Sequence, residues 1–346
     1  MSAALRGTWR SALGSLLLLT TASGAHVRAD EVAQFYAGRN VSIVVGFEAG
    51  GLYSTFSAIL ARQLGRHIPG RPNVIVQHMP GAGGIVAVNW GYTVAPKDGT
   101  VIITPLPGLP LRVPLGLDKP TYDATKFQWL GGWGEGINAV TLRRDTAPAL
   151  TVEAARQHEV ILGAISKSSN TYTVPALMNN LLGTRFKIIT GYQGGAPIRL
   201  AMEKGEIHGW SGQNDGWRMI DHPWLRDGNL VHLAQLASKP APDLPGVPML
   251  SSFAREPVEL SILKSIESGV ADRAVVVPPG VPEPRTQALA KAFQDTLRDP
   301  QFVKEASAAK FEIEPIAGET IQAFVASVAS LPPATIARMK KAMDLE

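Results

Sequence analysis

The fold of this chain is set by the sequence VSIVVGFEAGGLYS, which occupies residues 41–54. Its first five residues form a nearly continuous apolar run, as expected for a strand that is buried on both faces of a sheet. The glycines that follow favour a tight loop, and Ser54 favours the start of a helix. A helix start carries free backbone N–H groups and a partial positive charge, so this junction is a potential anion-binding site.

The same pattern of strand, small-residue loop and helix recurs three times along the chain. The further strands and their loops are residues 74–77 with 80–84, 160–165 with 166–170, and 186–190 with 191–197. The sequence places no obvious nucleophile, metal-ligand cluster or acid–base pair beside these junctions. The recurrence therefore indicates a binding protein that performs no chemistry.

Composition narrows the class of protein further. The chain has 346 residues, of which 45% are hydrophobic and 18% charged, which fits an ordinary globular protein of two domains. Its net charge of +4 is too small to indicate nucleic acid as a partner. There is no cysteine, which excludes disulfides and thiolate ligands and fits a bacterial periplasm.

Residues 1–25 have the features of a signal peptide. Arg6 and Arg10 form a positive region, residues 13–19 are apolar, and small residues follow up to Ala25. We expect cleavage before His26, with cleavage after Ala29 as a second possibility and an uncleaved anchor helix as the alternative. The expected destination is the periplasm.

The order of elements predicts an α/β fold. Residues 41–104 alternate strand, helix, strand, helix and strand, which favours a parallel sheet with right-handed crossovers. Residues 105–120 are rich in Pro, Leu and Gly and are expected to form a surface loop. Strands at 129–132 and 139–142 are expected to lead into a second lobe, in which the alternation restarts from Thr151.

Several familiar motifs are absent from the sequence. The dinucleotide fingerprint fails because Val86 stands where residues 81–84 would require a further glycine. There is no phosphate-binding P-loop, no G-x-S-x-G motif and no pair of histidines at a metal-binding spacing. We therefore expect no cofactor, no metal and no catalytic residue. An enzyme on the same scaffold and a nucleotide-binding protein are the disfavoured alternatives.

The segment 210–217 has an unusual composition, with Trp210 and Trp217 on either side of small and polar residues. It is expected to form a loop. The two indoles could line a ligand pocket or seal a packing surface, and the sequence favours neither.

Taken together, the junctions resemble the Bug-type substrate-binding proteins of tripartite tricarboxylate transporters. The resemblance covers nearly the whole chain after the leader. It rests on F-x-x-G-G-x-Y at 47–53, P-G-A-G-G at 80–84, A-P-K-D-G-T at 95–100, G-Y-Q-G-G-A at 191–196, G-E-I-H-G at 205–209, L-P-G-V-P at 244–248 and V-P-P-G-V-P at 277–282.

This resemblance implies a two-lobed periplasmic clamp of the type II class, in which each lobe is a mainly parallel sheet flanked by helices. The lobes would comprise residues 30–132 plus 274–346 and residues 133–273. Two turns of the first lobe would hold a ligand carboxylate through backbone amides and bound waters, and the second lobe would close over it. The implied ligand-binding residues are Phe47, Gly50, Gly51, Tyr53, Ser54, Gly81, Ala82, Gly83, Gly84, Ile85, Thr104, Ser168, Ser169, Asn170, Tyr192, Gly194, Gly195, Ala196, Gln213, Asn214 and Asp215.

The implied function is capture of an organic dicarboxylate or tricarboxylate and its delivery to membrane transporter subunits by a monomeric protein. The alternative is a sensor that presents its bound ligand to a membrane signalling protein. The chain departs from the family pattern at Leu52, where a third glycine is usual, and at Ser54, where an acid is usual. These departures concern the identity of the ligand rather than the fold.

Overall fold

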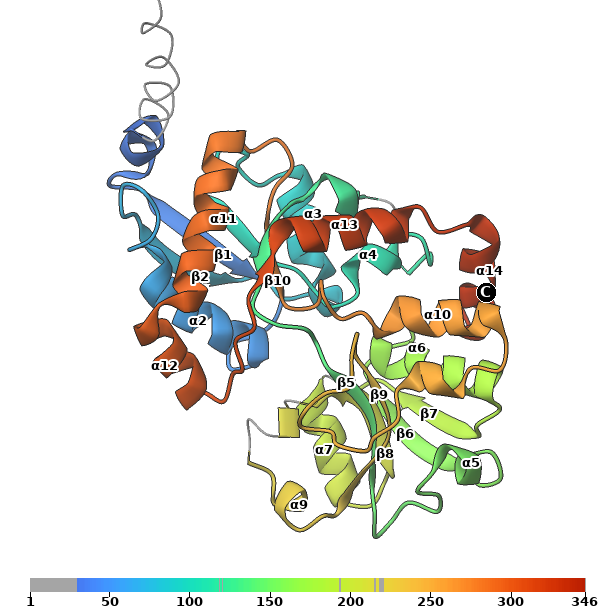
Figure 1. The fold of residues 1–346 in the computed structure, drawn as a ribbon. Coiled ribbons are helices and arrows are strands. Elements are labelled where there is room, and N and C mark those ends of the chain that lie inside the picture. Colours follow the sequence, from blue (N-terminus) through green and yellow to red (C-terminus); the bar gives the residue numbers. More distant parts are fainter. Residues whose placement is uncertain are drawn as a thin grey trace, which may run out of the picture.

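The computed structural model of the chain describes residues 30–117, 119, 121–192, 194–214, 216–217 and 221–345. The predicted signal peptide and both candidate cleavage sites lie outside these ranges. The described chain forms two sheets, each covered by helices, and these make up the upper and lower lobes of Figure 1. A short helix at residues 30–36 precedes the first strand.

The sheet of the first lobe has six strands in the order β11-β4-β10-β3-β1-β2. Its strands are β1 (Asn40–Val45), β2 (Asn73–His78), β3 (Val101–Thr104), β4 (Gln128–Gly132), β10 (Ala274–Val277) and β11 (Ile316–Ala317). β1 pairs in parallel with both β2 and β3, as predicted from the alternation of elements. β10 runs antiparallel to β3 and β4, so the sheet is mixed.

Helices cover both faces of this sheet. They are α2 (Leu52–Leu64), α3 (Ile85–Thr93), α4 (Leu109–Arg112), α11 (Glu283–Arg298), α12 (Pro300–Ala308) and α13 (Gly318–Ala329), with short 3-10 turns η1 (Ala82–Gly84) and η2 (Ala124–Lys126). Figure 1 shows α2, α11 and α12 on one side and α3, α4 and α13 on the other. Successive strand side chains point to opposite faces, so Ile43 enters the core beneath α2 and Val44 enters the core beneath α3. This two-sided burial explains the apolar run of β1.

The sheet of the second lobe has five strands in the order β7-β6-β8-β5-β9. Its strands are β5 (Asn138–Arg143), β6 (Val160–Ala164), β7 (Phe186–Thr190), β8 (Gly209–Gln213) and β9 (Leu230–Leu236). Its helical elements are α5 (Val152–Ala155), α6 (Asn170–Leu177), η3 (Met178–Leu182), α7 (Gly195–Glu203), α9 (Pro223–Arg226), η4 (Leu250–Phe253) and α10 (Pro257–Glu267). β6 pairs in parallel with β7 and β8, whereas β5 runs antiparallel to β8 and β9.

The chain passes between the two sheets more than once. It passes from β4 to β5 through residues 133–137 and returns from α10 to β10 through residues 268–273. The C-terminal helix α14 (Pro333–Ala342) then packs beside α6 and α10, and its Met339 enters the second hydrophobic core. The expected assignment of all of 274–346 to the first lobe is therefore wrong for α14, which Figure 1 shows beside the second lobe.

Two further expectations need correction. Residues 210–213, part of the segment expected to form a loop, lie in the central strand β8, where Gly209 is so close to Thr141 that a Cβ would lie 2.2 Å from its carbonyl oxygen. The described residues of the segment 105–120 do not form a surface loop, because Leu109 and Leu115 are buried.

Within the described ranges, no single helix has both the length and the apolar character that crossing a membrane requires. The same residues contain no group of three or more His, Asp or Glu side chains placed to hold a metal ion.

Candidate ligand-binding site

Two glycine-containing loops of the first lobe meet at the carboxyl ends of β1 and β2. A Cβ on Gly46 would lie 2.9 Å from the Cα atom of Gly84, closer than real side chains approach a backbone. A Cβ on Gly84 would in turn lie 3.3 Å from Cζ of Phe47. The absence of side chains at Gly46 and Gly84 thus allows the loop after β1 and the loop after β2 to form one surface.

The second of these loops has an unusual backbone. Four successive residues, Gly81 to Gly84, have positive φ angles, and Ala82 among them has φ 45°. A positive φ is uncommon for alanine, and such strain is concentrated at functional sites. Gly81, Ala82 and Gly83 are exposed, as are Gly50 and Gly51 in the first loop. Backbone N–H groups at the starts of α2 and α3 are therefore accessible to a ligand.

A polar chain of three groups joins the two loops. The Gly50 N–H donates to Ser54 Oγ at 3.3 Å, and Ser54 Oγ lies 2.8 Å from His78 Nε2. Ser54 is buried in the first turn of α2, and His78 is exposed at the end of β2. The N-cap of α2 is Gly51, which makes no side-chain cap hydrogen bond, so Ser54 lies inside the first turn and does not cap the helix as the sequence suggested.

The Tyr53 side chain connects the two lobes. Its ring stacks on Phe47 with centroids 5.0 Å apart. Its hydroxyl donates to the backbone carbonyl of Asp272 at 2.8 Å and accepts from Gln213 Nε2 at 3.4 Å. Gln213 ends β8, so predicted residues of both lobes meet here.

Thr104 does not reach the accessible surface of these loops. It ends β3, is 1% exposed, and shares a 3.3 Å hydrogen bond with Ser57 of α2. Ile85 begins α3 and is half-buried. The structure therefore gives Thr104 a supporting position beneath the loops.

In the second lobe, the serine-rich loop after β6 is held by its own hydrogen bonds. Ser169 Oγ donates to the Ser166 carbonyl at 2.8 Å, and the Ser168 carbonyl accepts from Arg112 of α4 at 3.0 Å. At the start of α6, the Asn170 amide donates to Asn138 at 3.3 Å. Arg112 thus ties this loop to the first lobe.

The loop after β7 starts helix α7. The Tyr192 ring packs on Gly163 of β6, and burial raises the pKa of its phenol. Gly194 has φ 131°, which favours glycine, and Gly195 lies against the Trp210 indole. Ala196 in the first turn is exposed. This helix start therefore has accessible backbone at the carboxyl end of its sheet.

The remaining predicted residues behave differently from one another. Asn214 is 3% exposed and donates to Asp243 at 2.7 Å, so its side chain is committed within the lobe. Asp215 lies outside the described residues. Trp217 is 1% exposed and belongs to a core cluster, and Trp210 packs over glycine backbone. The packing alternative therefore holds for these two indoles.

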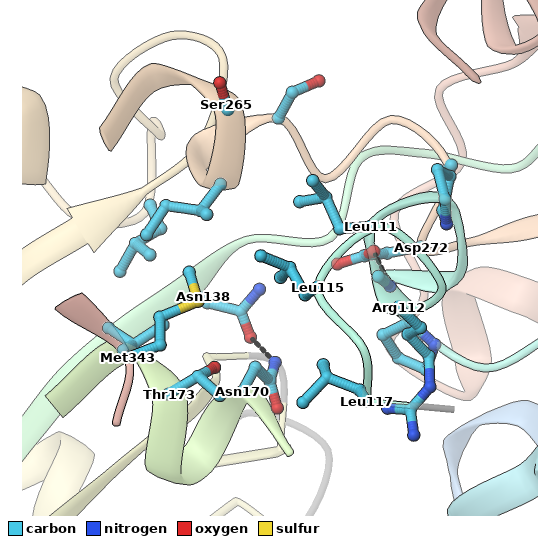
Figure 2. Close-up of a pocket in the computed structure, with 18 of the residues that line it drawn as sticks. Leu111, Arg112, Leu115, Leu117, Asn138, Asn170, Thr173, Ser265, Asp272 and Met343 are labelled. Carbon is cyan, nitrogen blue, oxygen red and sulfur yellow. Dashed lines mark hydrogen bonds between the residues drawn. The ribbon is translucent and has the colours of Figure 1, made fainter. Parts of the chain in front are cut away.

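A cavity of about 100 Å³ lies between the lobes on the side of α4. Figure 2 shows Asn138, Asn170 and Thr173 of the second lobe on one side and Asp272 with the α4 segment on the other. Its lining includes two predicted residues, Ser168 and Asn170, but no residue of the first-lobe loops 46–54 and 80–85. The cavity and the glycine loops are thus separate features of the boundary between the lobes.

Asp272 lies at the side of this cavity where the chain crosses between the lobes. Its Oδ1 accepts from the Gly108 N–H at 2.8 Å. Burial raises the pKa of its carboxyl to about 6, an effect that outweighs the Gly108 hydrogen bond and the nearby Arg273 charge.

Four residues near this boundary were not predicted from the sequence: His78, Arg112, Asn138 and Asp272. Each belongs to no short motif, and its partners lie 24 to 164 positions away in the chain. Only the position of His78 at the end of a predicted strand gave a local signal.

The two lobes, each a mixed sheet covered by helices, have the fold of the periplasmic binding proteins. No protein-family model matches the chain. A protein of Cupriavidus necator described as "UPF0065 protein in gbd 5'region" is 25% identical over 303 residues, covering 84% of this chain and 83% of the relative. Protein BugT of Bordetella pertussis is 26% identical over 238 residues, covering 66% and 70%.

Solved structures share the fold. A TctC solute-binding protein from Polaromonas, without ligand, has a TM-score of 0.65 at 21% identity and covers 89% of this chain and 99% of its own. MatC from Rhodopseudomonas palustris with bound malate has a TM-score of 0.63 at 19% identity, covering 88% and 99%. R. palustris Rpa4515 with adipate has a TM-score of 0.64 at 21% identity, covering 89% and 97%. The chain is thus similar in sequence to a UPF0065 protein and to BugT, and it has the fold of TctC-type solute-binding proteins.

Proposed function

We propose that this protein is an extracytoplasmic solute-binding protein that holds an organic dicarboxylate or tricarboxylate between its lobes and delivers it to a tripartite tricarboxylate-type membrane transporter. In this role it acts in the periplasm and catalyses no reaction. The ligand carboxylate binds the N–H groups of the glycine loops, and the second lobe closes over it. Malate and adipate in two proteins of the same fold support this class of ligand.

The observation that carries the proposal is the meeting of the two first-lobe loops at Gly46 and Gly84. This contact brings the starts of α2 and α3 together, with exposed glycines on both sides. Each charge-assisted hydrogen bond from an amide to a carboxylate is worth about 1.5–3 kcal/mol. Two or three of them with packing contacts would reach micromolar affinity, about −8 kcal/mol.

The second lobe supplies the groups that contact the ligand when the two lobes close. Gln213 already touches Tyr53 across the boundary, and the starts of α6 and α7 lie at the carboxyl ends of β6 and β7. A ligand that contacts both lobes binds the closed state better, and this difference in affinity drives closure. Closure then marks the loaded protein for the membrane subunits.

The test is calorimetric titration of the purified mature protein with malate, adipate and, as an uncharged comparison, glucose. The expected result is micromolar binding of at least one acid and none of glucose. Binding of glucose without binding of any organic acid would refute the proposed ligand class. Transport itself is tested by uptake of the bound acid in cells with and without the gene.

A matched pair of variants locates the site. Gly83 and Gly38 have similar positive φ angles of 67° and 70°, and a Cβ on either meets no atom within 4 Å. Alanine at either position is expected to cost a similar ~1–2 kcal/mol of stability through backbone strain. Only Gly83→Ala is expected to weaken acid binding, because Gly83 lies in the exposed glycine loop proposed to hold the carboxylate, whereas Gly38 precedes β1. Equal binding by both variants would place the ligand elsewhere.

A further inference from the structure

The two first-lobe loops contain few ionisable groups. Residues 46–54 and 80–85 include no Lys, Arg or His and one carboxylate at Glu48, and His78 at the end of β2 adds one imidazole beside them. Glu48 and His78 are both exposed. With neutral His78 the loops carry a net negative charge, which opposes an anion, and protonation of His78 cancels that charge.

Ser54 can form a hydrogen bond with the His78 imidazole in both its neutral and its protonated form. Ser54 Oγ accepts the Gly50 N–H and lies 2.8 Å from His78 Nε2. When the imidazole is neutral at Nε2, the hydroxyl donates its proton to that nitrogen. When the imidazole is protonated, Nε2–H donates to a second lone pair of Oγ. The hydrogen bond therefore survives protonation, and the added charge stays beside the first turn of α2.

We propose that His78 is a specificity-determining residue of the anion site, which favours multiply charged carboxylates and strengthens their binding as the pH falls. This inference rests on the proposed function. Histidine is the side chain that ordinarily changes charge between pH 5 and 8. Of the elements near His78, the end of β1 and the first turn of α3 carry no ionisable group. On α2, the Tyr53 hydroxyl donates a hydrogen bond to the Asp272 carbonyl.

Among the other charges at the boundary, Glu48 in the first loop, Lys167 in the serine-rich loop and Arg199 on α7 belong to residue types that ordinarily keep their charge between pH 6 and 8.5. Asp272 is different, because burial raises the pKa of its carboxyl to about 6. Its change of charge is common to every protein compared below that retains Asp272. One charge added several ångströms from a partly solvated ligand charge changes affinity roughly five- to tenfold. A dicarboxylate gains more from this charge than a monocarboxylate of the same length.

The experiment measures the affinity of the wild-type protein, His78→Gln and the matched control His158→Gln for adipate at pH 6 and pH 8.5. His158 is an exposed histidine of the second lobe. All three proteins experience the same titration of adipate itself, so the difference between proteins isolates the imidazole. Glutamine retains a partner for Ser54, and thermal melting of each variant verifies that it is folded.

The expected result is roughly five- to tenfold tighter adipate binding at pH 6 than at pH 8.5 for wild type and His158→Gln, reduced to about twofold or less for His78→Gln. A monocarboxylate of equal length, hexanoate, should show a smaller loss on substitution. If adipate binds with the same pH dependence in all three proteins, the role of His78 is refuted while the proposed function stands. If no organic acid binds wild type at either pH, both proposals fail.

Discussion

Substitution of Asp272 by Asn should change how the stability of the protein depends on pH. The carboxyl is 8% exposed, and its burial raises its pKa from 3.8 to about 6. Between these values the folded protein retains a proton that the unfolded chain has released. Acidification therefore favours the folded state: the contribution is full below about pH 4 and is lost as the pH rises through 6.

The size of this effect follows from the pKa difference. A shift from 3.8 to about 6 corresponds to about 3 kcal/mol in the free energy of unfolding. Asparagine binds no proton, but its amide oxygen retains an acceptor for the Gly108 N–H. The stability of wild type relative to Asp272→Asn should therefore fall by about 3 kcal/mol between pH 4 and pH 8.

Urea unfolding at pH 4, 5, 6, 7 and 8 measures this difference, because urea leaves the ionic strength unchanged. Asp227→Asn is the matched control, since Asp227 is exposed. Its stability relative to wild type should change little over the same range. The burial argument would be refuted if the difference in free energy of unfolding between wild type and Asp272→Asn stayed constant with pH. It would also be refuted if wild type gained stability relative to the variant as the pH rose.

Five other variants test the glycine loops and the boundary between the lobes. Gly46→Ala should destabilise the protein by about 1–3 kcal/mol and abolish acid binding, because its methyl group forces the two glycine loops apart, as thermal melting and calorimetry will show. Gly51→Ala should weaken binding and lower the melting temperature only slightly: alanine is disfavoured at the N-cap of α2, but the backbone has φ −84° and a Cβ meets no atom closer than 4.0 Å. Arg112→Ala should cost about 2 kcal/mol in urea unfolding, because the serine-rich loop loses its tie to the first lobe. We expect addition of the acid to change the tryptophan fluorescence of the wild type. This change should vanish in Trp210→Phe, because Trp210 packs at the start of α7, and persist in Trp217→Phe, because Trp217 is buried in the core.

The strands and loops of the first lobe could be predicted because their signals are local. β1 is apolar because both of its faces are covered, and the glycines after it are required by the approach of the next loop. β8 escaped prediction because its sequence, Gly209 to Gln213, lacks the apolar alternation of a strand. Its glycines are required by Thr141 and by the Trp210 indole, which belong to the folded packing rather than to the local chain.

The placement of the segment after β3 could likewise not be predicted from local sequence. Proline, glycine and leucine at 105–120 suggest a loop, yet Leu115 enters the core of the second lobe and Arg112 binds the Ser168 carbonyl. No local pattern predicts this, because burial between two lobes depends on where the second lobe lies. The same holds for α14, which leaves the first lobe to pack on α6.

By itself, the sequence determined the succession of strands and helices, the glycine-containing helix starts and the resemblance to Bug-type proteins, because each depends on residues close together in the chain. Only the tertiary structure decided which side chains meet: His78 with Ser54, Tyr53 with Gln213 and Asp272 with Gly108. These contacts join residues up to 164 positions apart, and their geometry comes from the packing of whole sheets and helices. Backbone periodicity carries no record of that packing.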